Sequence, residues 1–131
     1  MTSFDHRYIE SITHRDYVFV YCDGAAIHNG ASYAQAGFAV YFPDPELDWL
    51  NESGSLPDYE QTSNRAELYA LIRAAEAAPT DGRQVVIFSD SKYAINCVGR
   101  WLDNWRSNGW LNSRGVPVHN QDLIERLDRE T

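Results

Sequence analysis

Tyr17-Val18-Phe19-Val20-Tyr21-Cys22-Asp23-Gly24 places an acid and a glycine directly after six apolar or aromatic residues. β-Branched and aromatic residues are typical of strands, so residues 17–22 predict a buried strand that ends at Asp23. Residues 84–90, Gln-Val-Val-Ile-Phe-Ser-Asp, repeat the pattern, with Asp90 just beyond a short apolar run. Two buried strands, each followed by an acid, are the features around which the rest of the chain is arranged.

The segments around these two strands predict the remaining elements. Residues 37–42 indicate a second strand, and residues 48–56 a weaker third strand with a turn at Ser53-Gly54. Good helix formers with one apolar face occupy residues 64–78, and helical patterns return at 92–107 and 120–129. The expected fold is α/β. Strands one to three form antiparallel hairpins, and the helix at 64–78 crosses over to a fourth strand parallel to the first.

Composition limits the class of protein. The 131 residues suit one domain, and 44% hydrophobic residues supply a core. No apolar run approaches the ~20 residues of a membrane span, and residues 1–16 lack a signal core, so we expect a soluble, intracellular protein. Cys22 and Cys97 lack a CxxC spacing and are expected to be buried free thiols.

The net charge of −8 is unevenly distributed along the chain. Residues 44–60 hold six acids and no Lys or Arg, whereas residues 91–116 hold four basic residues against one acid. Basic residues drive phosphate binding, so the overall acidity argues against a nucleic-acid partner but leaves room for a local basic face.

Three carboxylates are expected to converge. If the first and fourth strands are parallel neighbours, Asp23 and Asp90 lie side by side at one edge of the sheet, and Glu67 in the first turn of the crossover helix can point to the same spot. Clustered carboxylates repel one another unless they bind divalent cations. Each residue also has an ordinary structural interpretation: Asp23 as a turn residue, Asp90 as a helix cap, and Glu67 as part of a capping box.

The motifs around these acids resemble those of type 1 ribonucleases H. Val20-Tyr21-Cys22-Asp23-Gly24-Ala25, Thr62-Ser63-Asn64-Arg65-Ala66-Glu67-Leu68 and Phe88-Ser89-Asp90-Ser91-Lys92-Tyr93-Ala94-Ile95-Asn96 are similar to the family's first three motifs. Residues 105–110 and 117–123 match the region that follows, in the family's order. The resemblance runs from residue 17 to the end of the chain and implies a ribonuclease H-like fold, with residues 1–16 as an N-terminal extension and 17–131 as the ribonuclease H domain.

The resemblance implies a monomeric endonuclease that cuts the RNA strand of RNA–DNA hybrids. Asp23, Glu67 and Asp90 would hold two Mg²⁺ ions, roughly 4 Å apart, with Mn²⁺ as an alternative metal. Asp23 would bridge both ions, and the products would carry a 5′-phosphate and a 3′-hydroxyl.

The resemblance also assigns contacts to each strand of the hybrid. The RNA strand would lie near Gly24, Ala26, Asn29, Ser63, Asn64 and Lys92. The DNA strand would lie near Thr62, Trp101, Trp105, Ser113 and Asn120, with Thr62 and Asn120 on a phosphate. Many family members have Asn and Gln where this chain has Ser63 and Asn64, and these shorter side chains reach less far. The region around Arg106-Ser107 is less rich in Lys than in many members, and the net charge is −8, so we expect weaker, more salt-sensitive hybrid binding than in basic relatives.

The family's fourth acid lies on a later helix, after a fifth strand, and the sequence ends before either. We therefore expect a C-terminally truncated domain that lacks that strand and that last helix. Two alternatives to an active nuclease follow: a hybrid-binding fragment or pseudo-enzyme that cannot cut, and an inert fragment.

Overall fold

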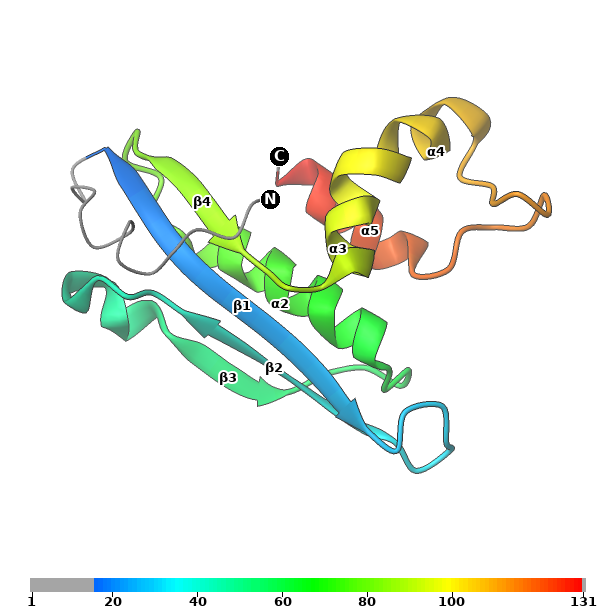
Figure 1. The fold of residues 1–131 in the computed structure, drawn as a ribbon, viewed down its shortest axis with the longest axis horizontal. Coiled ribbons are helices and arrows are strands. Elements are labelled where there is room, and N and C mark those ends of the chain that lie inside the picture. The colour runs from blue at the N-terminus through cyan, green and yellow to red at the C-terminus, as the bar shows by residue number, and fades with distance from the viewer. Residues whose placement is uncertain (1–15, 131) are drawn as a thin grey trace.

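The computed structural model describes residues 16–130 of the chain. Its sheet contains four strands, β1 (Tyr17–Ile27), β2 (Gln35–Tyr41), β3 (Glu52–Ser55) and β4 (Gln84–Phe88), in the order β3-β2-β1-β4 (Figure 1). The first three strands pair antiparallel, and β4 pairs parallel to β1. The predicted mixed α/β sheet is therefore confirmed. The predicted N-terminal extension, residues 1–16, falls outside the described residues except for Asp16.

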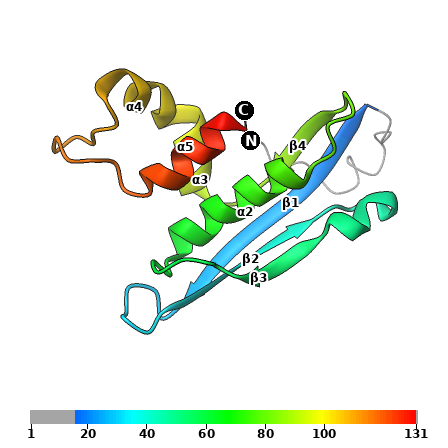
Figure 2. The same cartoon turned by 180° about the vertical axis from the view of Figure 1, so that it is seen from behind.

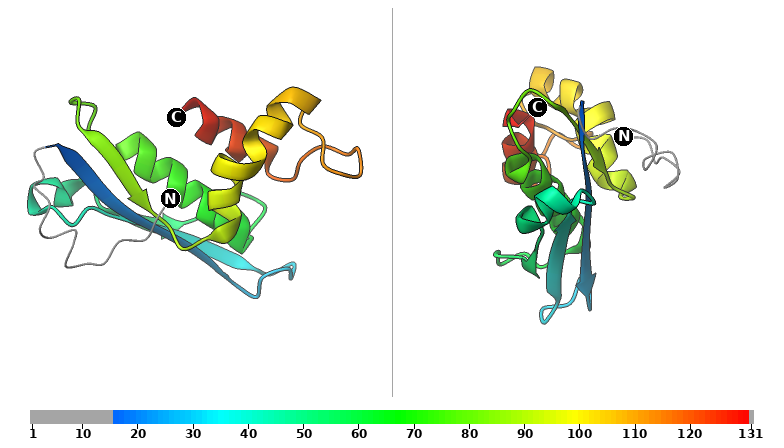
Figure 3. Two further views of the ribbon diagram at one scale, coloured as in Figure 1. Left: turned by 45° about the horizontal axis from the view of Figure 1, so that its top comes forward. Right: turned by 90° about the vertical axis from the view of Figure 1, so that its left-hand side faces the viewer.

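The helices lie mainly on one side of this sheet. Helix α2 (Ser63–Ala77) is the crossover from β3 to β4 and packs along the back of β1 (Figure 2). Helix α5 (Gln121–Arg129) lies against α2 on the same side, as Figure 3 shows with the sheet nearly edge-on. A 3₁₀ helix, η1 (Pro45–Leu50), joins β2 to β3. Between β4 and α5 the chain forms α3 (Lys92–Asn96), a π-helical turn η2 (Cys97–Trp101) and α4 (Leu102–Asn108).

The hydrophobic core fills the space between the sheet and the helices. Alternate residues of β1, such as Val18 and Val20, point into it, as the period-two geometry of a strand requires. They meet the apolar face of α2, which buries Leu68, Leu71 and Ile72. Both cysteines are buried free thiols, as predicted. Among the described residues, no helix combines the length and apolar character of a membrane span.

Several element boundaries differ from those predicted. Strand β1 continues to Ile27, because residues 21–27 pair with residues 35–41 of β2 in a regular antiparallel register. Cross-strand pairing here overrides the weak strand propensity of Gly24 and its two alanine neighbours. The predicted turn at Ser53-Gly54 lies inside β3, and residues 45–50 form the 3₁₀ helix. The helix predicted at 92–107 is interrupted by the π turn, where one extra residue per turn enters the helix.

Candidate metal centre

Three carboxylates from three separate elements meet at one place on the sheet. Asp23 stands in the middle of β1, Glu67 in α2, and Asp90 two residues beyond the end of β4. Each residue offers one carboxylate oxygen, and these three oxygens lie within 4.8 Å of one another. The convergence expected from the sequence is therefore present in the fold, although the strand end that we expected at Asp23 is not.

Strand register explains why Asp90 reaches Asp23. Phe88, the last residue of β4, pairs with Tyr21 in parallel register, so the chain leaving β4 runs alongside the next residues of β1. Ser91 then caps α3 by accepting a hydrogen bond from the backbone N–H of Ala94. The cap is therefore Ser91, not Asp90, which leaves the Asp90 carboxylate available for another role.

Gly24 brings α2 close enough to add Glu67. A Cβ at position 24 would lie 2.3 Å from the backbone carbon of Ala66 and 2.5 Å from the backbone nitrogen of Glu67. Such distances are far inside van der Waals contact, so only glycine permits this approach. The backbone N–H of Gly24 then lies 3.0 Å from Oδ1 of Asp23 and 3.1 Å from Oε1 of Glu67.

The second oxygen of Glu67, Oε2, is buried and has no hydrogen-bond partner among the described residues. Burial, opposed by the Gly24 N–H and reinforced by the neighbouring Asp23 and Asp90, raises the pKa of Glu67 to about 7. Burial, together with the Glu67 charge, also raises the pKa of the adjacent Cys22 thiol to about 12. An unpartnered buried oxygen in a cluster of negative charge fits a divalent cation, which prefers oxygen ligands.

A pocket of about 350 Å³ opens beside Asp23 and Asp90. Its walls come from β1, β2 and the end of β4, and include the aromatic rings of Tyr21, Tyr41 and Phe88 as well as Asp23 and Asp90. Asp23 and Asp90 are thus reached from solvent along the sheet surface.

The residues predicted to contact RNA lie in β1, in the turn after it, and at the starts of α2 and α3. Gly24 and Ala26 are in β1, Asn29 is in the turn that follows it, and Ser63, Asn64 and Lys92 begin α2 and α3. Asn29 accepts a hydrogen bond from the backbone N–H of Ser63 at 3.1 Å, so the β1–β2 turn is tied to the first turn of α2. Ala26 packs in a small apolar cluster, and the Gly24 N–H is engaged by the carboxylates.

Trp101 and Trp105, two of the residues predicted to contact DNA, form one aromatic surface. Their ring centroids are 5.7 Å apart, and both rings are half-buried against the core. Trp110, with a left-handed backbone, stacks on Trp105 at 6.3 Å. Ser113 is exposed in the loop before α5.

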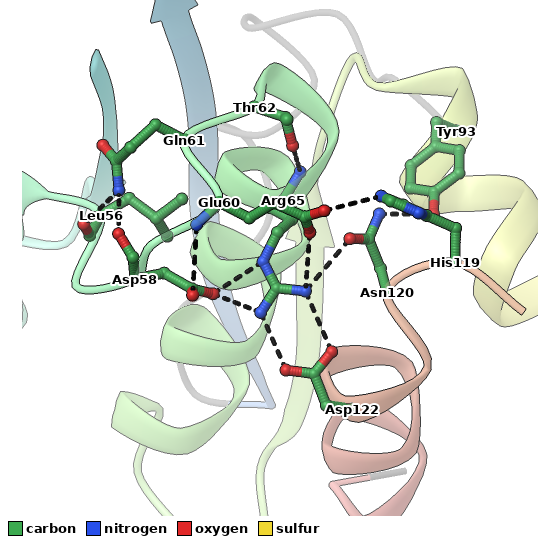
Figure 4. Close-up of polar contacts among 10 residues, drawn as sticks. All are labelled: Leu56, Asp58, Glu60, Gln61, Thr62, Arg65, Tyr93, His119, Asn120 and Asp122. Atoms are coloured by element: carbon green, nitrogen blue, oxygen red, sulfur yellow. Dashed lines mark hydrogen bonds and ion pairs between the residues drawn. The ribbon is translucent and has the colours of Figure 1, made fainter. Parts of the chain in front are cut away.

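Thr62 and Asn120, the predicted phosphate contacts, converge on a residue that sequence reasoning missed. The backbone N–H of Arg65 donates to Thr62 Oγ1, and the Arg65 guanidinium donates to Asn120 Oδ1 at 3.1 Å (Figure 4). Arg65 also donates to Asp58 at 2.7 Å and, with two nitrogens, to Asp122 at 3.0 and 2.8 Å. Only 7% of its side chain is exposed. Arg65 therefore joins the loop before α2 to the start of α5, and nothing in the residue pattern distinguished it from a surface arginine.

Comparison with known proteins places the chain in a family. The family model described as RNase H matches residues 15–131. Ribonuclease H of Schizosaccharomyces pombe is 42% identical over 117 residues, covering 89% of this chain and 42% of that protein. Human ribonuclease H1 is 37% identical over 117 residues, covering 88% of this chain and 40% of that protein.

A solved structure shares the fold. The foamy viral protease-reverse transcriptase in complex with dsDNA superposes with a TM-score of 0.67 and 25% identity, over 86% of this chain and 72% of that one. Because the family model matches nearly the whole chain, the protein is a member of the RNase H family.

Proposed function

We propose that this chain hydrolyses the RNA strand of RNA–DNA hybrids with the help of two divalent cations, and leaves 5′-phosphate and 3′-hydroxyl ends. The observation that carries the proposal is the convergence of Asp23, Glu67 and Asp90, with Oε2 of Glu67 buried and unpartnered within the described residues. Relatives that are named ribonuclease H support it, and this chain spans less than half the length of the Schizosaccharomyces pombe and human relatives.

Asp23, Glu67 and Asp90 would hold the cations, for which we propose Mg²⁺. When bound, such ions lower the pKa of a coordinated water and stabilise charge on a leaving oxygen. The Gly24 N–H orients two of the three carboxylates by donating to both. Cys22, whose raised pKa keeps the thiol protonated, takes no part as a nucleophile.

Selectivity for RNA must depend on the 2′-hydroxyl, the group that separates RNA from DNA locally. Asn29, Ser63 and Asn64 are polar, lie next to the first turn of α2, and can hydrogen-bond to a hydroxyl. Trp101 and Trp105 offer an aromatic surface on another element, on which sugars of the DNA strand would pack. The RNA strand is thus proposed to contact the first turn of α2, and the DNA strand the tryptophans of η2 and α4.

The test is a cleavage assay on an end-labelled RNA–DNA hybrid with Mg²⁺. Wild type is compared with Asp23→Asn, which removes one metal ligand, and with Asp48→Asn, an exposed acid on η1 that serves as the matched control. We expect cutting by wild type and Asp48→Asn, with a loss of at least about 100-fold in Asp23→Asn. Equal rates for all three proteins would contradict the proposal.

A second candidate is a hybrid-binding chain that does not cut. It is favoured by the number of clustered acids, because the described residues bring together three carboxylates where the family resemblance implies four. Binding of the hybrid in preference to duplex DNA, with no cutting by wild type under any divalent metal, would favour this candidate over the nuclease.

A further inference from the structure

Glu60 lies in the segment between β3 and α2 and belongs to the cluster around Arg65. Its carboxylate is 3.7 Å from Nη1 of Arg65 and 3.5 Å from Nε2 of His119. Figure 4 shows the Glu60 carboxylate between these two side chains, next to the Asn120 amide. Asp58 and Asp122 bond Arg65 at shorter distances, whereas Glu60 is 49% exposed and faces solvent.

The positive charge of Arg65 is more than compensated by the acidic side chains around it. Asp58 binds Nε, Asp122 binds two nitrogens, and Glu60 adds a third carboxylate, so one guanidinium is surrounded by a formal excess of two negative charges. Hydrogen bonds and charge from Asp122 and Asp58 raise the pKa of Arg65 above its ordinary value, because these carboxylates stabilise the charged guanidinium. A buried arginine in this state has little attraction left for a phosphate outside the cluster.

Thr62 and Asn120 touch this same cluster. Thr62 is two residues from Glu60 and accepts from the Arg65 N–H, and Asn120 accepts from the Arg65 guanidinium. A phosphate bound by the Thr62 hydroxyl and the Asn120 amide would therefore sit beside the Glu60 carboxylate. Two exposed negative charges at such short range repel each other.

We propose that the Glu60 carboxylate weakens the contact between this surface and a backbone phosphate of the DNA strand. The inference rests on the proposed binding of an RNA–DNA hybrid and states which residue limits its strength. A neutral side chain at position 60 would relieve the repulsion, and a basic one would turn the same surface into a phosphate site.

A purely structural role for Glu60 is the competing explanation. Its two ion-pair distances are long and its side chain is half-exposed, and such surface pairs contribute little to stability. Asp58 and Asp122 remain to compensate Arg65 when Glu60 is replaced. Glu60→Gln and Glu60→Lys are therefore expected to fold normally, and their melting temperatures check this directly.

The experiment measures affinity for a labelled RNA–DNA hybrid in metal-free buffer, across a series of salt concentrations. Glu60→Gln and Glu60→Lys are compared with the same two substitutions at Glu46, an exposed acid of η1 near the far end of α2 (Figures 1 and 2). We expect affinity about 3-fold higher in Glu60→Gln and about 10-fold higher or more in Glu60→Lys, which should also steepen the salt slope by about 0.9. The Glu46 variants should change affinity by less than about 2-fold on the same scale.

A second series locates the phosphate. Single uncharged methylphosphonates replace one DNA phosphate at a time in the hybrid. At one position the replacement should leave wild-type affinity unchanged or higher and should weaken Glu60→Lys, because only the variant attracts that phosphate.

The outcomes separate this inference from the proposed function. If wild type binds hybrid and the Glu60 variants behave like the Glu46 variants, the inference falls and the proposed function stands. If neither wild type nor Glu60→Lys binds hybrid, the inference falls, and the cleavage assay with Mg²⁺ decides the proposed function separately. Binding that appears only in Glu60→Lys supports the inference.

Discussion

The carboxylates of Asp23 and Glu67 share a single hydrogen-bond donor, the backbone N–H of Gly24, at 3.0 and 3.1 Å. One residue on β1 and one on α2 are thus held together by the glycine that also permits the two elements to touch. A single donor compensates only part of the charge of two carboxylates. The remaining repulsion disfavours the ionised, metal-free state and prepares the site for a cation.

The raised pKa of Glu67 predicts how stability depends on pH. Burial, and then the nearby acids, raise this pKa from its ordinary 4.5 to about 7, so within that window the native state holds a proton that the unfolded state has released. The free energy of unfolding should therefore fall as pH rises from about 4.5 to 7, by about 1–3 kcal/mol, and level off above. Acids with a lowered pKa, such as Asp122 beside Arg65, make the free energy of unfolding rise with pH, and they do so below this pH window.

Urea denaturation at several pH values in metal-free buffer measures this dependence. Glu67→Gln should abolish the decline between about pH 4.5 and 7 and should be more stable than wild type above it. Glu46→Gln, at an exposed position, should keep the wild-type profile. If the free energy of unfolding still declined in Glu67→Gln, a titrating group other than Glu67 would be responsible.

Divalent metal should stabilise the folded protein through the same three acids. At about ten times its dissociation constant, Mg²⁺ should raise the free energy of unfolding by about 1.4 kcal/mol near neutral pH. Asp90→Asn should lose this response, because it removes one of the clustered ligands, and Asp48→Asn should keep it. Thermal melts with and without Mg²⁺ at constant ionic strength provide the readout. An identical shift in wild type and Asp90→Asn would place metal binding elsewhere.

Gly24→Ala should separate β1 from α2. The added methyl would meet backbone atoms of Ala66 and Glu67 at 2.3–2.5 Å, which no side-chain rotation relieves. We expect a loss of about 3 kcal/mol or more of stability, at the upper end of overpacking effects, together with weaker binding of Mg²⁺.

Gly99→Ala is the matched control for this substitution. Gly99 lies in the π turn, and a methyl group there would point into open space, with no other part of the described chain within 4 Å beyond its own helix and neighbours. Alanine at this position should therefore be neutral or slightly stabilising. Equal unfolding midpoints for the two alanine variants in urea would show that the close approach at Gly24 is not required.

How far the sequence predicted this fold differs between elements. Apolar runs and helix formers predicted the parallel pairing of β1 and β4 and the crossover helix between them, because the order and spacing of apolar residues reflect burial and periodicity. The extension of β1 through Gly24 to Ile27 did not, because small residues carry little strand preference and pair here only through contact with β2 and α2. The π turn at 97–101 likewise left no mark on the helical pattern.

The site was predicted unevenly for the same reason. The convergence of Asp23, Glu67 and Asp90 could be expected from the order of the strands and the crossover helix, together with the motifs around the three acids. The role of Arg65 could not, because Asp122, which binds two of its nitrogens, lies 57 residues away and is joined to it only by tertiary packing. Buried polar residues whose partners are far apart in sequence are hidden from any local pattern.

Arg65 and Arg73 offer a matched test of burial, because both are arginines of α2 that bind two or more acids. Arg65 is 7% exposed and Arg73 is 27% exposed, with Glu52 and Glu76 as its partners. Arg65→Met would leave Asp58 and Asp122 without their cation and Asn120 without its donor, so we expect a loss of about 3–5 kcal/mol. Arg73→Met should lose about 1 kcal/mol or less, because Glu76 keeps Arg126 and Glu52 can be solvated. Urea denaturation of the two variants measures the difference. Equal losses would mean that the Arg65 cluster behaves as an ordinary surface ion pair, and that the loop before α2 and the start of α5 are held together by apolar packing instead.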